Sequence, residues 1–345
     1  MNDVPLKPGM AGELREAPDA VARQRQDLAV PLRELAARLR ARPPSVVVTC
    51  ARGSSAHAAT FGKHLIERHL AVPVAAAAPN IATVYKQRLR LSGQLFLAIS
   101  QSGRSDDLVE AAAAAKKAGA LTVALINAAD SPLAAACDIV LPLGAGAERS
   151  VAATKSFVAS LTALLGLVAG WSGNDGLDSA LERLPPRLAT AGDLDWGAAV
   201  SAFAAADSLI TIGRGPTLAI AREAALKLKE VCNLHAEAFS GAEFLHGPVA
   251  LVERNYPMLM LTANDEAGDG LRQLASDLRG KGAALLATEL GPAGTGTLPA
   301  LPPDQADADA VCLIQSFYAM VVSLASRRGI DPDRPRHLQK VTRTR

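Results

Sequence analysis

The sequence predicts an α/β protein made of two consecutive units, each a doubly wound parallel sheet flanked by helices. Three observations support this fold class. Short apolar runs alternate with alanine-rich stretches, the runs are apolar along their whole length, and the pattern of the first half returns in the second. The chain has 345 residues, of which 49% are hydrophobic and 20% charged, which suits two domains that each bury a core.

The first unit contains five candidate strands. They are short, apolar and separated by candidate helices, and they cover residues 45–50, 72–78, 95–100, 121–126 and 139–143. Between them, residues 57–69 and 106–118 have the apolar spacing of helices, and Gly119 follows the second of these. Strands that are apolar throughout are typical of a parallel sheet covered on both faces, which predicts a doubly wound sheet.

The second unit is predicted because the pattern of the first returns. Residues 51–53 (Ala-Arg-Gly) match residues 213–215 (Gly-Arg-Gly), and residues 97–100 (Leu-Ala-Ile-Ser) match residues 259–262 (Leu-Met-Leu-Thr) at the same offset. Both matches fall where a candidate strand ends. A duplicated α/β unit explains them better than chance does.

The boundary between the two units is expected near residue 190. Residues 157–170 are predicted to form a long helix, and Pro185-Pro186 is expected to break the chain that follows. The last residues are basic, contain prolines and lack periodicity, so they form a tail. The predicted domains are an N-terminal segment of residues 1–34, units of residues 35–190 and 191–330, and a tail of residues 331–345.

Charge and cysteine usage exclude several classes of function. The 36 Lys and Arg are balanced by 34 Asp and Glu, so the chain does not indicate a nucleic-acid partner. The four cysteines form no CxxC pair and no cluster with histidines, so neither a metal site nor a disulfide framework is expected. The N-terminus lacks the apolar core of a signal peptide, and residues 157–171 are too few to span a bilayer. We therefore expect a cytoplasmic protein with no membrane partner.

One loop has the composition of a phosphate site. Ser100-Gln101-Ser102-Gly103-Arg104-Ser105 follows an apolar strand and precedes a helix, where unpaired N–H groups and the helix dipole favour an anion. Its three serine hydroxyls add neutral donors, and the turn Arg52-Gly53-Ser54-Ser55 could present more to the same edge. The alternative is that Ser102 or Ser105 only caps the helix.

A carboxylate and an imidazole lie in one short segment of the second unit. Glu230 is near the end of a helix predicted to start after Gly215, with Lys227 just before it, and His246 stands in a turn before Gly-Pro. Such a pair can supply the two proton carriers that an aldose–ketose isomerisation needs. The alternatives are that Glu230 is only solvated or paired with Lys227, and that His246 is structural.

Six segments, in this order, resemble the sugar isomerase (SIS) family. They are Ser100-Gln101-Ser102-Gly103 and residues 151–155 (Val-Ala-Ala-Thr-Lys), 225–230 (Ala-Leu-Lys-Leu-Lys-Glu), 235–238 (His-Ala-Glu-Ala), 243–248 (Glu-Phe-Leu-His-Gly-Pro) and 333–340 (Asp-Arg-Pro-Arg-His-Leu-Gln-Lys). The resemblance runs from about residue 35 to the C-terminus. Within this family, the chain is most similar to the isomerase half of glucosamine-6-phosphate synthase and to the SIS-type glucosamine-6-phosphate deaminases.

This resemblance implies two SIS subdomains in a homodimer, with the active site near the subunit interface and no cofactor. The phosphosugar would sit at the first subdomain. The residues that would hold its 6-phosphate and neighbouring hydroxyls are Ser55, Ser100, Gln101, Ser102 and Ser105, with Val151 at the sugar.

The resemblance also implies catalytic roles. Glu230 would be the base that moves a proton between C1 and C2, with Lys227 assisting it. His246, reaching in from the partner subunit, would open the sugar ring. Lys340 would be the tail lysine that forms a Schiff base with the ketose in the synthases, and a mobile tail of this kind would exclude water when it closes.

Differences from the synthases favour the deaminases within this family. The synthases carry an N-terminal glutaminase domain with a cysteine nucleophile, whereas this chain begins Met1-Asn2 and has about 35 residues before the first subdomain. Arg104 stands where the synthases usually have Glu, and Ser150 stands where they have Gly. We therefore expect conversion of glucosamine 6-phosphate and water to fructose 6-phosphate and ammonia. In that direction C2 already carries the nitrogen, so whether Lys340 forms a Schiff base or only binds the sugar stays open.

Three alternatives remain. The chain could be an isomerising aminotransferase without a glutaminase, or it could act on another amino-sugar phosphate. Outside the enzymes, it could be a phosphosugar sensor of the kind found in regulators. A sensor would need a DNA-binding module, for which the short N-terminal segment has no room.

Overall fold

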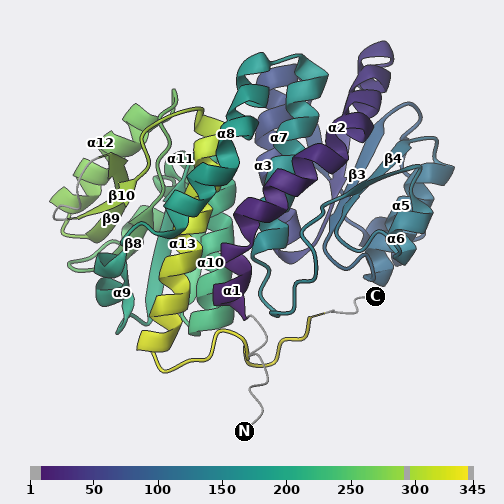
Figure 1. Ribbon diagram of the computed structural model, residues 1–345. Helices are drawn as coiled ribbons and strands as arrows, with labels where there is room; N and C mark the ends of the chain where they lie inside the picture. Colours follow the sequence, from purple (N-terminus) through teal and green to yellow (C-terminus); the bar gives the residue numbers. More distant parts are fainter. Residues whose placement is uncertain (1–8, 291–295, 341–345) are drawn as a thin grey trace, which may run out of the picture.

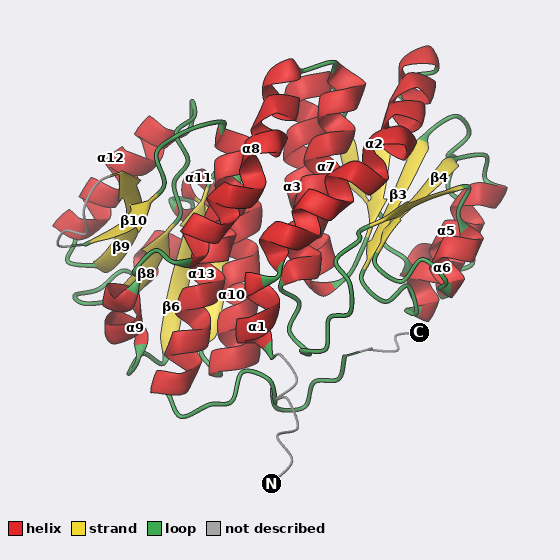
Figure 2. Cartoon of the chain, in the orientation of Figure 1, coloured by secondary structure: helices red, strands yellow, loops and turns green. Residues whose placement is uncertain are grey.

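Two five-stranded parallel sheets lie on either side of a central layer of long helices (Figure 1). The structure is a computed structural model that describes residues 9–290 and 296–340, so parts of the predicted N-terminal segment and tail lie outside it. Figure 2 shows that helices also cover the outer faces of both sheets. Each sheet is therefore buried on both sides, as its uniformly apolar strands require.

The first sheet has the strand order β2-β1-β3-β4-β5, and all of its pairs are parallel. Its strands are β1 (Val47–Cys50), β2 (Val74–Ala76), β3 (Leu95–Ser100), β4 (Leu121–Ile126) and β5 (Ile139–Pro142). Its helices are α3 (Gly53–Leu70), α4 (Asn80–Thr83), α5 (Asp106–Lys117), α6 (Pro132–Ala136) and α7 (Lys155–Ser172). Every strand predicted from the sequence is present, and the predicted helices correspond to α3, α5 and α7.

The second sheet has the corresponding order, β7-β6-β8-β9-β10, again with parallel pairs. Its strands are β6 (Ser208–Gly213), β7 (His235–Ser240), β8 (Pro257–Met260), β9 (Ala284–Leu290) and β10 (Thr297–Ala300). Its helices are α9 (Gly197–Phe203), α10 (Thr217–Cys232), α11 (Gly241–Phe244), α12 (Gly268–Gly280) and α13 (Ala306–Arg327), with a 3-10 turn at Pro248–Leu251. The fold is thus the predicted pair of α/β subdomains.

Two helices precede the first sheet and were not expected. They are α1 (Met10–Arg15) and α2 (Ala17–Ala41), and α2 packs against α7 through buried residues such as Leu28 and Leu35. Pro18 falls in the first turn of α2, where its missing N–H costs nothing, whereas Pro31 is tolerated inside the helix. The predicted boundary at residues 34–35 lies within α2.

The expected chain break at Pro185-Pro186 is wrong. Both prolines lie inside α8 (Asp175–Gly192), which runs through them. A proline inside a helix costs about 3 kcal/mol, but α8 buries four leucines (Leu177, Leu181, Leu184 and Leu188), each contributing about 1.5–3 kcal/mol. Packing of this face therefore outweighs the local preference of the prolines.

Two core helices, α7 and α13, are long and apolar enough to cross a membrane by length and composition alone. The share of their most apolar window that is buried inside the protein is 83% for α7 and 78% for α13. Their apolar surface is therefore explained by packing between the two sheets.

The strand order places a crevice where the chain changes direction in the first sheet. The connection after β1 leads to β2 on one side, and the connection after β3 leads to β4 on the other. In open parallel sheets, ligands bind at the carboxyl ends of the strands at such a switch point. Ser54 and Ser55, in the first turn of α3, and the loop of residues 100–105 both lie there.

Candidate functional site

A cavity of about 210 Å³ lies at this switch point. It is lined by the turn after β1, the loop after β3, residues 151 and 153, the end of α10 and the C-terminal tail. The residues predicted from the sequence that line it are Ser55, Ser100, Gln101, Ser102, Ser105, Val151, Lys227, Glu230 and Lys340. The fold brings all of the predicted site residues except His246 into one cavity.

The loop after β3 folds back on itself through its own hydroxyls. Ser100 Oγ accepts a hydrogen bond from the Gly103 N–H at 3.0 Å, and Ser102 Oγ accepts one from the Arg104 N–H at 3.4 Å. Gly103 has φ +63°, and a Cβ atom there would overlap the Ser131 side chain, so the turn requires glycine. Ser105 occupies the N-cap position of α5, but its side chain makes no capping hydrogen bond. The alternative that these serines only cap the helix is therefore wrong.

The beginning of α5 is prepared electrostatically for an anion. Asp107, in the first turn, is buried, and its Oδ2 accepts two hydrogen bonds from the Arg52 guanidinium at 2.7 and 3.0 Å. Arg52 comes from the turn after β1 and also lines the cavity. The ion pair neutralises a carboxylate that would otherwise repel a phosphate at this helix terminus.

The acid–base residues lie on one face of α10. This helix ends at Cys232 and is capped by Asn233, whose left-handed conformation (φ +48°) is tolerated by asparagine. Lys227 is fully buried and forms ion pairs with Glu230 and with Glu223, the latter at 3.4 Å between Nζ and Oε1. Burial acts to lower the pKa of the Lys227 ammonium, but Glu223 and Glu230 outweigh it, and the pKa is raised. Lys227 is therefore a cation that fixes Glu230 at the cavity.

Glu223 was not singled out from the sequence. Its side chain is fully buried and bonds to two other elements: Oε2 lies 2.8 Å from His57 Nδ1 on α3, and Oε1 accepts from the Tyr318 hydroxyl on α13 at 3.2 Å. Burial acts to raise the pKa of the Glu223 carboxyl, but Lys227 and His57 outweigh it, and the pKa is lowered. The spacing Glu-x₃-Lys-x₂-Glu on one helix was the available signal.

The C-terminal tail brings Lys340 to the same cavity. Its ammonium donates to Glu148 Oε2 at 3.0 Å and to the Ser150 carbonyl at 2.6 Å. The Glu148 side chain is completely buried, and it too was missed by the sequence analysis. Burial of a loop carboxylate leaves no periodic signal in the sequence.

His246 is the exception among the predicted site residues. It is exposed in the turn that follows α11 and does not line the cavity. Two large apolar side chains near it are also exposed, Leu245 by 55% and Leu251 by 52%. Within one chain, the structure does not bring His246 to Glu230.

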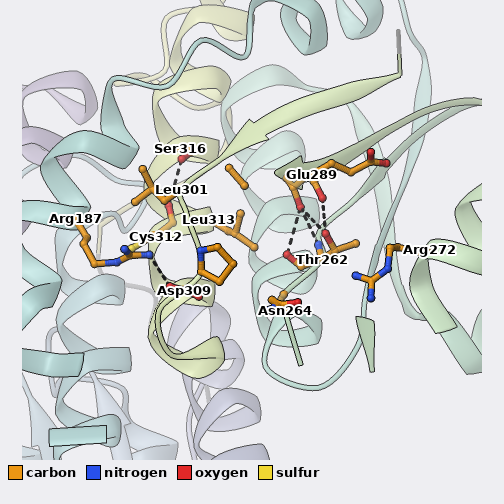
Figure 3. Close-up of a pocket in the computed structure, with 14 residues that line it drawn as sticks. Arg187, Thr262, Asn264, Arg272, Glu289, Leu301, Asp309, Cys312, Leu313 and Ser316 are labelled. Atoms are coloured by element: carbon orange, nitrogen blue, oxygen red, sulfur yellow. Dashed lines mark hydrogen bonds and ion pairs between the residues drawn. The ribbon is translucent and has the colours of Figure 1, made fainter. Parts of the chain in front are cut away.

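A second cavity, of about 390 Å³, lies at the carboxyl edge of the second sheet (Figure 3). Arg187 and Arg272 flank it, and each is paired with an acidic residue, Asp309 and Asp269 respectively. Thr262, two residues after β8, bonds to the Thr288 hydroxyl. Pairs within this cavity join Arg187 to Asp309 and Thr262 to Thr288, whereas the acid–base residues and the tail belong to the first cavity.

Known proteins resemble this chain both in sequence and in fold. The sequence model of the SIS domain family matches residues 43–169 and 202–288. A crystal structure from Silicibacter pomeroyi DSS-3, whose description assigns it to the phosphosugar isomerases, is 47% identical with a TM-score of 0.90 and covers 94% of this chain and 99% of that one. The C-terminal domain of glucosamine-fructose-6-phosphate aminotransferase from Francisella tularensis is 26% identical with a TM-score of 0.82, covering 97% and 100% of the two chains.

Curated relatives extend this similarity. The glutamine–fructose-6-phosphate aminotransferase (isomerizing) of Symbiobacterium thermophilum is 33% identical over 88% of this chain and 52% of the relative. The chain thus spans about half the length of the curated relatives it matches.

Proposed function

Since this chain belongs to the SIS domain family and has the fold of its phosphosugar isomerases, we propose that it is an isomerising glucosamine-6-phosphate deaminase. It would convert glucosamine 6-phosphate and water to fructose 6-phosphate and ammonia. One observation carries the proposal: Glu230 shares a cavity with the hydroxyl-rich loop after β3. A base at one wall and phosphate donors at another match the two ends of a phosphosugar.

The residues suggest an order of events. Ser55, Ser100 and Ser105 bind the 6-phosphate at the start of α5. In the open-chain sugar, Glu230 takes the proton from C2 and returns it to C1, which moves the carbonyl character to C2 as an imine. Water then adds to C2, the C2–N bond breaks, and ammonia leaves with fructose 6-phosphate as the product.

Lys227 and Lys340 act on either side of this proton transfer. Lys227 keeps the Glu230 carboxylate in place through their ion pair. Lys340, which lines the same cavity, would either polarise an oxygen of the sugar or form a Schiff base with it. Both roles require an ammonium or amine held at a fixed position within the cavity.

We include a homodimer in this proposal because His246 is remote from its own chain's cavity. Exposed Leu245 and Leu251 give the surrounding surface an apolar character suited to a second copy. The His246 imidazole of that copy would then open the sugar ring. Mixing inactive E230Q and H246A subunits should restore about a quarter of the parent activity, because half of the random dimers contain one intact site. If mixing restores nothing, His246 does not act across an interface.

A second candidate is the isomerising aminotransferase. Relatives with that name are 33% identical to this chain, which favours a closely related reaction. Arg104 and Ser150 in the cavity loops support the deaminase instead, because both have the forms expected of the deaminases.

The test is a coupled assay for ammonia and fructose 6-phosphate across a panel of amino-sugar phosphates. We expect turnover of glucosamine 6-phosphate by the parent and near-complete loss in E230Q. Turnover of a galactosamine phosphate alone would change the substrate. Tight binding across the panel without turnover would overturn the enzyme proposal and favour a sensing module.

A further inference from the structure

Ser150 connects the N-terminal helix, the cavity loop and the C-terminal tail. Its N–H donates to the Glu13 carboxylate of α1 at 3.3 Å. Its hydroxyl donates to Asp333 Oδ1 at 3.1 Å, and its carbonyl accepts from Lys340 Nζ at 2.6 Å. One residue therefore contacts the tail at two points and is itself held by α1.

The first point of the tail, Asp333, is also bonded directly to α1. Its Oδ1 accepts a hydrogen bond from the Met10 N–H at 2.7 Å. A Cβ atom on Gly9 would overlap the Asp333 carboxylate, although the Gly9 backbone (φ −81°) suits any residue. Glycine at position 9 thus leaves the space that this carboxylate occupies.

The second point, Lys340, is bonded to Glu148, whose carboxylate is held by hydrogen bonds from its own loop. Glu148 Oε1 accepts from the Thr154 and Ser156 N–H groups, both at 3.0 Å, and Oε2 accepts from the Ser156 hydroxyl at 2.6 Å. Because the completely buried Glu148 is fixed by its own loop, it sets the position of the Lys340 ammonium rather than following it.

The loop itself is anchored to the N-terminal helices. Lys155 is buried and bonds to the Glu16 carboxylate and, at 2.7 Å, to the Ala147 carbonyl. Glu13, also buried, accepts from the Arg149 N–H. The position of the tail therefore depends on residues at the opposite end of the chain.

We propose that Gly9, Glu148, Ser150 and Asp333 form a tail seat that positions Lys340 for turnover. These are positioning residues, because they reach the sugar only through Lys340. The part played by Lys340 in turnover rests on the proposed function, whereas the seating of the tail does not. The seat also explains what Ser150 adds over glycine, since its hydroxyl donates to Asp333 and glycine has no side chain that could do so.

The experiment uses the full chain with Gly9→Ala and Asp333→Ala, each of which disrupts the contacts of the Asp333 carboxylate. Gly280→Ala is the matched control, because a Cβ atom there meets nothing within 4 Å. Asp333→Asn is the conservative variant, since its amide oxygen still accepts hydrogen bonds. Limited trypsin digestion, followed by intact mass, measures cleavage after Arg336, which lies between Asp333 and Lys340.

We expect cleavage after Arg336 to become about tenfold faster in Gly9→Ala and Asp333→Ala, the factor expected when a charged hydrogen bond is lost. Gly280→Ala should match the parent, and Asp333→Asn should recover most of the protection. In the coupled assay, kcat should fall about tenfold or more in the two disrupted variants at little change in KM, because displacing a catalytic group impairs the chemical step.

Two results would overturn the proposal. Cleavage at the parent rate in both disrupted variants would show that the tail has no such seat. Faster cleavage with unchanged kcat would show that the seat does not position Lys340 for turnover. If the parent fails to act on any amino-sugar phosphate, the proposed function fails, and the trypsin comparison still decides whether the seat exists.

Discussion

Lys227 and Glu230 form an ion pair one turn apart on α10, at the wall of the cavity in the first subdomain. The lysine is fully buried, and its raised pKa keeps it a cation at neutral pH. A buried cation beside a partly exposed carboxylate fixes the base without removing its access to the substrate.

Glu230→Gln should keep the fold and phosphosugar binding but lower turnover by roughly 10²–10⁴-fold, the range for loss of a general base. Glutamine can still accept a hydrogen bond from Lys227, so the local packing survives. Steady-state kinetics and circular dichroism are the measurements. Near-parent turnover in a folded variant would place the base elsewhere.

Ser105→Ala should raise KM more than it lowers kcat, because the phosphate lies away from the reacting carbons. This variant is the cleaner probe of the loop, since the Ser105 side chain makes no capping hydrogen bond. Ser100→Ala should act likewise but also lose the bond to the Gly103 N–H. Inorganic phosphate should compete with substrate in the parent, and unchanged substrate affinity in both variants would exclude a phosphate role for the loop.

Removal of residues 331–345 should abolish turnover while the two subdomains stay folded. The described part of this segment, residues 331–340, contains no helix or strand, and it supplies Lys340 to the cavity. Thermal unfolding and kinetics of the truncated chain provide the check. A truncated protein that is unfolded on isolation would show the tail to be structural.

Most of the fold could be predicted because the burial of each strand can be recognised from its own residues. The residues of β3 and β4 were predicted as the structure has them, since a strand buried on both faces is apolar throughout. The helix α2 was not predicted because its prolines and charged residues are typical of a loop. The sequence predicted a break within α8 because Pro185-Pro186 disfavours a helix locally, whereas packing of its leucines stabilises the helix.

The site was predictable where the chemistry lies in contiguous residues and not where it depends on distant contacts. The serines of the β3 loop and the pair Lys227 and Glu230 stand in short motifs. Glu223 and Glu148 acquire their roles from burial and from partners on other elements, such as His57 and Lys340. A short sequence motif does not predict a hydrogen-bond partner that lies more than a hundred residues away in the chain.

A buried carboxylate should couple stability to pH. Asp307, at the start of α13, is fully buried and bonds to His69 Nε2 at 2.8 Å and to Arg68 Nη1 at 3.3 Å, both on α3. Burial acts to raise the pKa of its carboxyl, but hydrogen bonds from His64 and His69 outweigh it, and the pKa is strongly lowered. Because the folded-state pKa is the lower one, the stabilisation is complete above the unfolded pKa of about 3.9 and is lost as pH falls toward the folded value.

Asp307→Asn should therefore lower the free energy of unfolding by about 1–3 kcal/mol at pH 7, because the amide keeps only one of the two acceptor oxygens and leaves buried donors facing its NH₂ group. The difference from the parent should shrink as pH falls below about 4, because the Asp307 carboxyl of the unfolded parent chain then begins to take up a proton while that of the folded chain stays ionised. Urea unfolding at several pH values measures this. A difference that stays constant down to pH 2 would show that the charge of Asp307 is not the cause.

The source of nitrogen separates the two candidate enzymes. Release of ammonia from glutamine by the known type of glutaminase requires a cysteine nucleophile, and a reactive cysteine needs a lowered pKa and exposure. The four cysteines of this chain, Cys50, Cys137, Cys232 and Cys312, are all buried. Burial raises the pKa of Cys137 to about 11 and of the other three to about 12, so none of the four is suited to this role.

With glutamine as the only nitrogen source, the purified chain should therefore form no glucosamine 6-phosphate from fructose 6-phosphate. As a deaminase, it should form ammonia and fructose 6-phosphate from glucosamine 6-phosphate. Ammonium at high concentration should drive the reverse reaction through the same imine, and Glu230→Gln should slow both directions equally, because microscopic reversibility requires the same base. Appreciable glucosamine 6-phosphate with glutamine, in protein freed of other glutaminases, would reject the deaminase and establish the aminotransferase.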